Sequence, residues 1–123
     1  MLEAYSLNIA VEADSNVVFN STSLQKGCTA ERTAPDTFTL NKCGVYMVSI
    51  DASAEASTTL QLYKDGVAQP QAQATGLNPS FVTLVQVGKN NSCCPCASGT
   101  TIQVRNSVAT TLTDANITIT KVV

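Results

Sequence analysis

The stretch that decides the fold is residues 37–66, TFTLNKCGVYMVSIDASAEASTTLQLYKDG. Apolar and polar residues alternate in it twice, over Val45–Ala52 and again over Thr59–Tyr63. Successive side chains of a β-strand point to opposite faces, so this alternation predicts two strands that are each buried on one side. The first strand has four side chains on the face that we expect in the core: Tyr46, Val48, Ile50 and Ala52.

Two connections in this stretch carry turn residues. Asn41-Lys42-Cys43-Gly44 ends in a glycine, which adopts a positive φ without steric cost. Asp65-Gly66 is the pair that a type I′ hairpin turn prefers, because both central residues of that turn need a positive φ. The order strand, turn, strand, hairpin indicates an antiparallel sheet.

The rest of the chain continues the pattern, and helical periodicity is weak throughout. Further strands are expected at residues 7–12, 17–19, 81–87, 100–106 and 116–123. The most apolar of them is Phe81–Val87, which we expect to be central in its sheet, whereas Ala68–Ser80 reads as a long loop or a short edge strand. The sequence therefore predicts an all-β, antiparallel sandwich or jelly roll.

The composition argues against several classes of function. The chain has 123 residues, enough for one domain, and carries 7 Lys and Arg against 9 Asp and Glu, a net charge of -2. We expect no nucleic-acid partner, because no basic surface is available to neutralise phosphates. The sequence has no His, which removes the commonest general base and every His-ligated metal site.

Residues 1–6, MLEAYS, lack the basic and apolar regions of a signal peptide, and no stretch approaches the roughly 18 apolar residues of a membrane helix. We therefore expect that the chain is made in a cytoplasm and does not insert into a membrane.

The central third contains Phe38-Thr39-Leu40, then Gly44-Val45-Tyr46, then the hairpin through Asp65-Gly66, and it is followed by Gly99–Val104 and a closing strand. In this order of motifs the chain resembles the superfamily of tumour necrosis factor and the complement globular heads. Gly27-Cys28, the loop Cys93-Cys94-Pro95-Cys96 and the ending Ile117–Val122 look like small bacterial and bacteriophage members of that superfamily, from Firmicutes and gut phages. The resemblance covers roughly residues 27 to 123.

This resemblance implies a trimeric jelly roll of about 8–10 strands without catalytic activity. It implies a bacteriophage virion surface protein made in the bacterial host cytoplasm, which decorates or cements the capsid or forms a head-fibre knob. Its partners would be two further copies of itself and the major capsid protein or a fibre. The alternative is a head that binds a host-surface receptor, protein or glycan, as in a phage tail tip or a spore-surface adhesin. Residues 1–26 would hold N-terminal strands and an attachment segment, and residues 27–123 the jelly-roll core.

Apolar positions of the expected strands form the predicted core and trimer interface. They are Phe38, Tyr46, Val48, Ile50, Leu60, Leu62, Phe81, Val85, Val87, Ile117 and Ile119. On Phe81–Val87 the other face carries Val82 and Leu84, so we expect this strand to be buried on both sides, as in a strand at a three-fold interface. A strand of an ordinary sandwich with one apolar outer face is the alternative.

Five cysteines, Cys28, Cys43, Cys93, Cys94 and Cys96, leave three alternatives open. They are free thiols with at most one bridge such as Cys28 to Cys43, disulfides formed after release, or a structural zinc site. Cys93 and Cys96 have Cys-x-x-Cys spacing, and Cys28 and Cys43 or the loops of other subunits would supply the remaining thiolates. Apart from zinc, we expect no cofactor.

Carboxylate pairs such as Asp51 with Glu55, or Glu12 with Asp14, are the residues that glycan cleavage would need. Alternation places Asp51 on the face opposite Tyr46 and Val48, where charged residues are the default on a half-buried strand. We therefore expect no catalytic residues and no enzyme.

Overall fold

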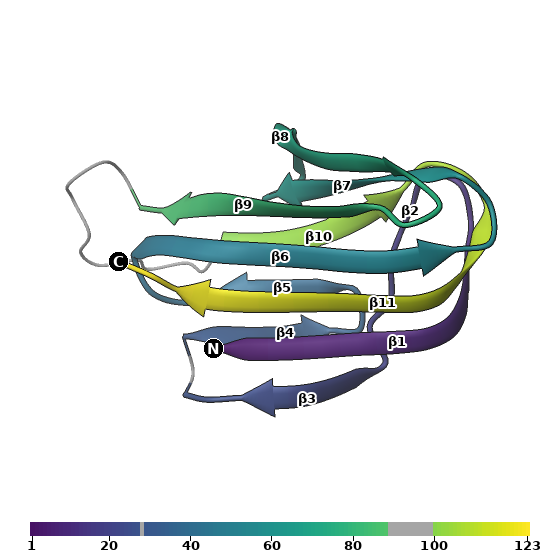
Figure 1. Cartoon of the computed structure of the whole chain (residues 1–123). Helices are drawn as coiled ribbons and strands as arrows, with labels where there is room; N and C mark the ends of the chain where they lie inside the picture. Colours follow the sequence, from purple (N-terminus) through teal and green to yellow (C-terminus); the bar gives the residue numbers. More distant parts are fainter. Residues whose placement is uncertain (28, 89–99) are drawn as a thin grey trace.

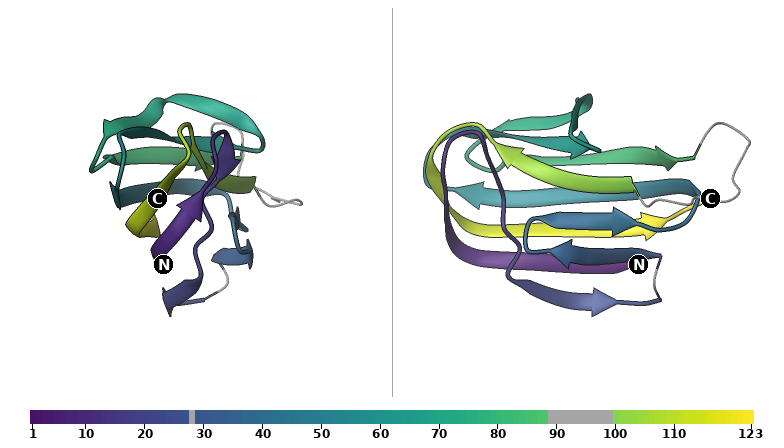
Figure 2. Two further views of the ribbon diagram at one scale, coloured as in Figure 1. Left: turned by 90° about the vertical axis from the view of Figure 1, so that its right-hand side faces the viewer. Right: turned by 180° about the vertical axis from the view of Figure 1, so that it is seen from behind.

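Two antiparallel sheets pack face to face (Figure 1). The computed structural model describes residues 1–27, 29–88 and 100–123, and every element in those ranges is a strand. Sheet A has the order β3-β1-β11-β6-β9, and sheet B has the order β4-β5-β10-β7-β8 with β2 paired to β10. Figure 2 shows the two layers from the end and from behind. The predicted all-β sandwich is confirmed.

The bounds of the strands are as follows. Sheet A contains β1 (Leu2–Val11), β3 (Ser21–Gln25), β6 (Gly44–Ala54), β9 (Ser80–Val87) and β11 (Thr110–Lys121). Sheet B contains β2 (Ser15–Asn16), β4 (Ala30–Ala34), β5 (Thr37–Leu40), β7 (Thr58–Lys64), β8 (Val67–Gly76) and β10 (Thr100–Asn106).

The core lies between the sheets and follows the predicted alternation. On β6 the side chains of Tyr46, Val48, Ile50 and Ala52 are buried, whereas Met47 and Asp51 are exposed. Ten of the eleven apolar side chains predicted for the core or the trimer interface are buried in this core: Phe38, Tyr46, Val48, Ile50, Leu60, Leu62, Val85, Val87, Ile117 and Ile119. The eleventh, Phe81, is partly buried and packs against the same cluster. All eleven therefore hold the two sheets of one chain together.

Both predicted turns have the expected backbone. Asp65 and Gly66 have φ values of 50° and 80°, so the β7–β8 hairpin has the two positive φ angles of a type I′ turn. Gly44 has a φ of 143°, and a Cβ added there would collide with the backbone oxygen of Val123. The glycine of the Gly-x-Tyr motif is thus required by both conformation and space.

One prediction about the strands was wrong, and of the two alternatives for Ala68–Ser80 the edge strand is confirmed, although it is longer than expected. Phe81–Val87 is not central: β9 is an edge strand of sheet A, paired only with β6 in that sheet. Within this chain it is buried on one side only: Val85 and Val87 lie in the core, whereas Val82 and Leu84 on the outer face are exposed. Ala68–Ser80 is largely a ten-residue strand, β8, at the edge of sheet B, where Pro70 is tolerated because an edge strand needs fewer backbone donors.

Residues 1–26 supply strands to the same two sheets. β1 lies between β3 and β11, and the side chains of Leu2 and Ala4 are fully buried. β2 pairs with β10 in the other sheet through Ser15 and Asn16. The attachment role of this segment stays a prediction.

A buried polar network closes one end of the sandwich. The amide of Asn106 is fully buried, and its Oδ1 accepts a hydrogen bond of 2.5 Å from the hydroxyl of Thr58. Its Nδ2 donates to the carbonyl oxygen of Val108 at 2.7 Å and to that of Glu12 at 3.2 Å. One side chain therefore connects β7, β10 and the segment after β1, and no polar atom of this amide is left without a partner.

Replacing Asn106 with Leu should lower the free energy of unfolding by about 3 kcal/mol, because the hydroxyl and carbonyl groups around it would stay buried without partners. Urea unfolding followed by circular dichroism measures this change. Asn20→Leu is the matched control, since Asn20 is exposed, and it should change stability by less than about 0.5 kcal/mol. Equal stability of the two variants would contradict the role of the network.

Tyr46 anchors the start of β6. Its ring is fully buried, and its hydroxyl donates a hydrogen bond of 2.7 Å to the carbonyl oxygen of Lys42. Burial raises the pKa of the phenol above its ordinary value of 10.0, partly offset by the backbone hydrogen bond from Lys42. The folded state therefore favours the neutral phenol more strongly than the unfolded chain does.

Alkali should destabilise the protein through Tyr46. Because the pKa of Tyr46 is higher in the folded state, its contribution to stability is complete below the unfolded pKa of about 10 and is lost as the pH rises through the folded pKa. Tyr46→Phe should cost about 1 kcal/mol at neutral pH and flatten the loss of stability above about pH 10. Urea unfolding at several pH values tests this, with Tyr5→Phe as the surface control; identical pH profiles for wild type and Tyr46→Phe would refute it.

Candidate functional site

The outer face of sheet A carries a group of neighbouring exposed apolar side chains. Val82 and Leu84 on β9 are 62% and 60% exposed, and Met47 on β6 lies directly opposite Leu84 in the strand register. Thr118 and Ser49, which follow across the sheet from Val82, are small. We call Met47, Val82, Leu84 and these small neighbours the sheet A face.

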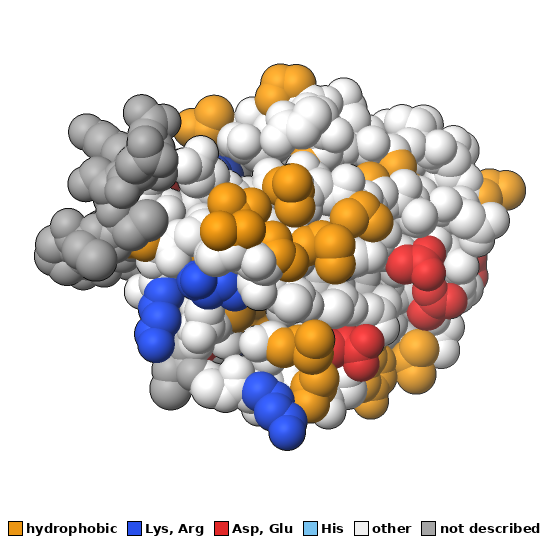
Figure 3. All heavy atoms as spheres, turned by 60° about the vertical axis from the view of Figure 1, so that its left-hand side comes forward, with side chains coloured by type: hydrophobic (Ala, Val, Ile, Leu, Met, Phe, Trp, Pro, Cys, Tyr) orange, Lys and Arg blue, Asp and Glu red, His pale blue; other side chains and the backbone are white. Residues whose placement is uncertain are grey.

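Charged residues border this apolar region. Asp51 is exposed on the same outer side of β6, as alternation predicted, four residues from Met47. Figure 3 shows hydrophobic side chains gathered across the middle of the molecule, between Lys and Arg side chains toward one end and Asp and Glu side chains toward the other. An apolar centre with a charged rim is typical of a protein–protein interface.

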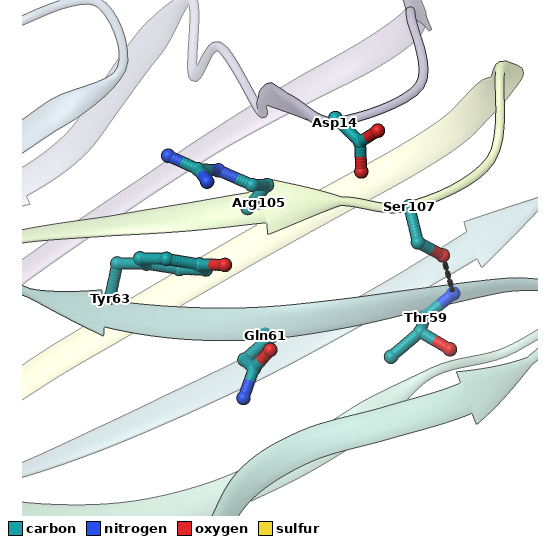
Figure 4. Close-up of a pocket in the computed structure, with 6 residues that line it drawn as sticks. All are labelled: Asp14, Thr59, Gln61, Tyr63, Arg105 and Ser107. Atoms are coloured by element: carbon teal, nitrogen blue, oxygen red, sulfur yellow. Dashed lines mark hydrogen bonds between the residues drawn. The ribbon is translucent and has the colours of Figure 1, made fainter. Parts of the chain in front are cut away.

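The outer face of sheet B is polar and contains a small pocket of about 90 Å³ (Figure 4). Outward-facing side chains of β7 and β10 and two residues of adjoining turns line it: Asp14, Thr59, Gln61, Tyr63, Arg105 and Ser107. The guanidinium carbon of Arg105 lies 4.0 Å from the centre of the Tyr63 ring, in a cation–π contact.

Strand register brings the pocket together. Arg105 pairs with Gln61 on β7 and with Asn16 on β2, so it lies in the middle of three strands. The hydroxyl of Ser107 accepts a hydrogen bond of 3.0 Å from the backbone nitrogen of Thr59, which fixes one wall. Sequence reasoning missed this site. Alternation places Gln61, Tyr63 and Arg105 on outer faces, but it does not tell which strands are neighbours.

The carboxylates are arranged differently from the predicted pairs. Glu12 and Glu55 line one open groove at the end of the sandwich, together with small residues such as Ala56 and Ala109. Asp14 lines the separate pocket on sheet B. Glu12 and Asp14 therefore line different pockets, and Asp51 lines neither of these two.

Most of the cysteine cluster falls outside the described residues, namely Cys28, Cys93, Cys94 and Cys96. Cys43 is described: it lies between β5 and β6 and is disulfide-bonded. A disulfide sulfur offers no thiolate to zinc, so zinc ligation by Cys43 would first require reduction. Within the ranges that the structure covers, no three His, Cys, Asp or Glu side chains are grouped to hold a metal ion. No helix in those ranges is long and apolar enough to cross a membrane.

Comparisons with known proteins support the fold. No family model matches the sequence, and no curated protein matches it. Among solved structures, the globular domain of zebrafish complement 1qA protein is similar with a TM-score of 0.78 and 14% identity, over 99% of this chain and 96% of that chain. The PRD1 vertex protein P5 has a TM-score of 0.69 and 12% identity, over 99% and 96% of the two chains. Murine APRIL has a TM-score of 0.67 and 12% identity, over 98% of each.

These structures confirm the predicted fold, an all-β jelly roll of the kind found in tumour-necrosis-factor-like proteins and complement globular heads. Because the identities are 14% or lower, the likeness concerns the fold alone. The bacterial or bacteriophage character of the chain stays a prediction.

Proposed function

We propose that this chain is a non-enzymatic homotrimer on the surface of a bacteriophage virion, where it decorates or cements the capsid or forms the knob of a head fibre. The observation that carries the trimer is the exposed sheet A face, and the virion role is supported by the fold shared with a phage vertex protein. In this proposal the chain is made in the cytoplasm of the bacterial host and contacts the major capsid protein or a fibre.

The physical case for self-association rests on β9. Val82 and Leu84 are exposed on an edge strand of the sheet, and Met47 extends the apolar surface onto β6. Burying apolar surface stabilises by roughly 25 cal/mol per Å². The small side chains of Ser49 and Thr118 beside it allow a neighbouring copy to approach closely. Three copies related by a three-fold axis would each cover the sheet A face of a neighbour, so that this face would be buried in every copy.

Native mass spectrometry tests the trimer. The wild-type protein should have the mass of three chains, and Val82→Glu should raise the dissociation constant by about 100-fold or more, because a carboxylate would be buried without a partner. Val67→Glu is the matched control. Val67 is 64% exposed, close to the 62% of Val82, but lies on β8 of the other sheet, so this variant should stay trimeric.

A wild-type protein with the mass of one chain would refute the trimer. A Val82→Glu variant as trimeric as the control would refute the assignment of the interface to the sheet A face.

Purified particles test the virion role. Phage particles that encode this chain, isolated on a density gradient, should contain it in a fixed ratio to the major capsid protein by quantitative mass spectrometry. Purified wild-type protein should rebind to particles from a phage in which the gene is deleted, and Val82→Glu should rebind more weakly because a trimer offers three contacts at once. Particles that lack the chain would refute the virion role.

A second candidate function is a receptor- or glycan-binding head. The specific observation that favours it is the polar pocket on sheet B, which contains an arginine, an aromatic ring and a carboxylate. This function is compatible with a place on the virion surface, since the pocket and the sheet A face lie on different sheets.

A further inference from the structure

The strongest unexplained feature is Arg105. Within the described part of the chain its only contact with another charged or aromatic group is the cation–π contact with Tyr63, and no hydrogen bond is found for its guanidinium. An arginine that is partly enclosed in a sheet normally pairs with a carboxylate or a carbonyl, because its five N–H donors lose water there. Arg105 therefore has donors that the fold of this chain does not use.

One of these donors has a local explanation. Nε of Arg105 and Oδ1 of Asn16 are both buried without a partner, and the two residues face each other across the β2–β10 ladder. The strand register places this buried donor and this buried acceptor on neighbouring strands. The Nδ2 of Asn16 already donates to Asp36 at 3.1 Å, which holds the amide in place. The two terminal nitrogens of Arg105 then remain for a ligand.

The position of the guanidinium is prearranged for an anion. Its carbon lies 4.0 Å from the centre of the Tyr63 ring, and Gln61 on β7 pairs with Arg105 in the strand register. The terminal nitrogens of a guanidinium form a flat fork that matches the two oxygens of a carboxylate. Because stacking already restricts the side chain, little rotamer entropy is lost on binding.

The other end of the pocket offers acceptors instead of donors. Asp14 adopts a positive φ of 57° at the turn after β1 and presents its carboxylate above Ser107 (Figure 4). Gln61 donates its Nε2 to the carbonyl oxygen of Gln69 at 3.3 Å, which leaves its Oε1 as an acceptor. Carboxylate and amide oxygens of this kind accept hydrogen bonds from hydroxyl groups.

We propose that this pocket binds a carboxylated sugar residue, with its carboxylate on the terminal nitrogens of Arg105 and its neighbouring hydroxyls on Asp14 and Gln61. A cavity of about 90 Å³ accommodates one edge of a single sugar ring, not an oligosaccharide. We expect a dissociation constant of about 1 mM for one site. The inference deepens the second candidate function and does not depend on the trimer or on the virion role.

The test compares glucuronate with glucose, which has a CH₂OH group in place of the carboxylate. Binding to the full chain is followed by saturation-transfer-difference NMR titration up to about 10 mM sugar. Glucuronate should bind at least about 10-fold more tightly than glucose, and Arg105→Gln should remove this difference.

Control variants separate the pocket from general charge. Lys26→Gln removes the same charge from an exposed position beside β3, at the far edge of the other sheet, and should leave glucuronate binding unchanged. Gln61→Leu, on an outer position of β7, removes the amide oxygen that would accept a sugar hydroxyl without changing the charge, and it should weaken glucuronate binding at least about 10-fold. Thermal melting verifies that each variant is folded, and Gln61→Leu gives a reading if Arg105→Gln does not fold.

The outcomes distinguish the site from the function. Glucuronate binding that survives both Arg105→Gln and Gln61→Leu would overturn the pocket but leave a glycan-binding head in place. Equal affinity for glucose and glucuronate would overturn the role of the carboxylate. No binding of either sugar by the wild-type protein would overturn this inference and count against the glycan-binding function, while the oligomer measurement would be unaffected.

Discussion

The alternation of side chains between the two faces of the strands is the constraint on which the rest of the structure depends. On β6 it places Tyr46, Val48 and Ile50 between the sheets and leaves Met47 outside. The same period on β7 and β10 buries Leu62 and Val104 and leaves Tyr63 and Arg105 half-buried on the outer face. A shift of one residue in any of these strands would exchange the core with the surface. The core and both outer faces are therefore set by one pattern.

The local sequence was sufficient to predict features that depend on the conformation of one or two residues. The Asp65-Gly66 turn and Gly44 were predictable because a positive φ is a property of one or two residues. The position of β9 was not predictable in this way, because an apolar strand reads the same whether it lies in the middle of its sheet or at the edge. Only the pairing of strands that are distant in sequence separates these two cases.

The pocket on sheet B illustrates the same limit for a site. Asn16, Gln61 and Arg105 are far apart in the sequence and become neighbours only through the β2–β10 and β7–β10 ladders. None of the three belongs to a motif with a fixed spacing. The absence of His, by contrast, can be read directly from the sequence, because it depends on composition and not on which strands are neighbours.

The two outer faces differ in character, and this difference constrains how one chain can serve two contacts. An exposed apolar edge strand such as β9 invites uncontrolled association, so a defined neighbour on the sheet A face would protect the protein as well as stabilise it. The polar side chains on the outer face of sheet B are hydrated without a partner, so this face can stay exposed to solvent and bind a small ligand. If the chain is a trimer, three copies of a weak pocket act together, and avidity then compensates for the small area of each site.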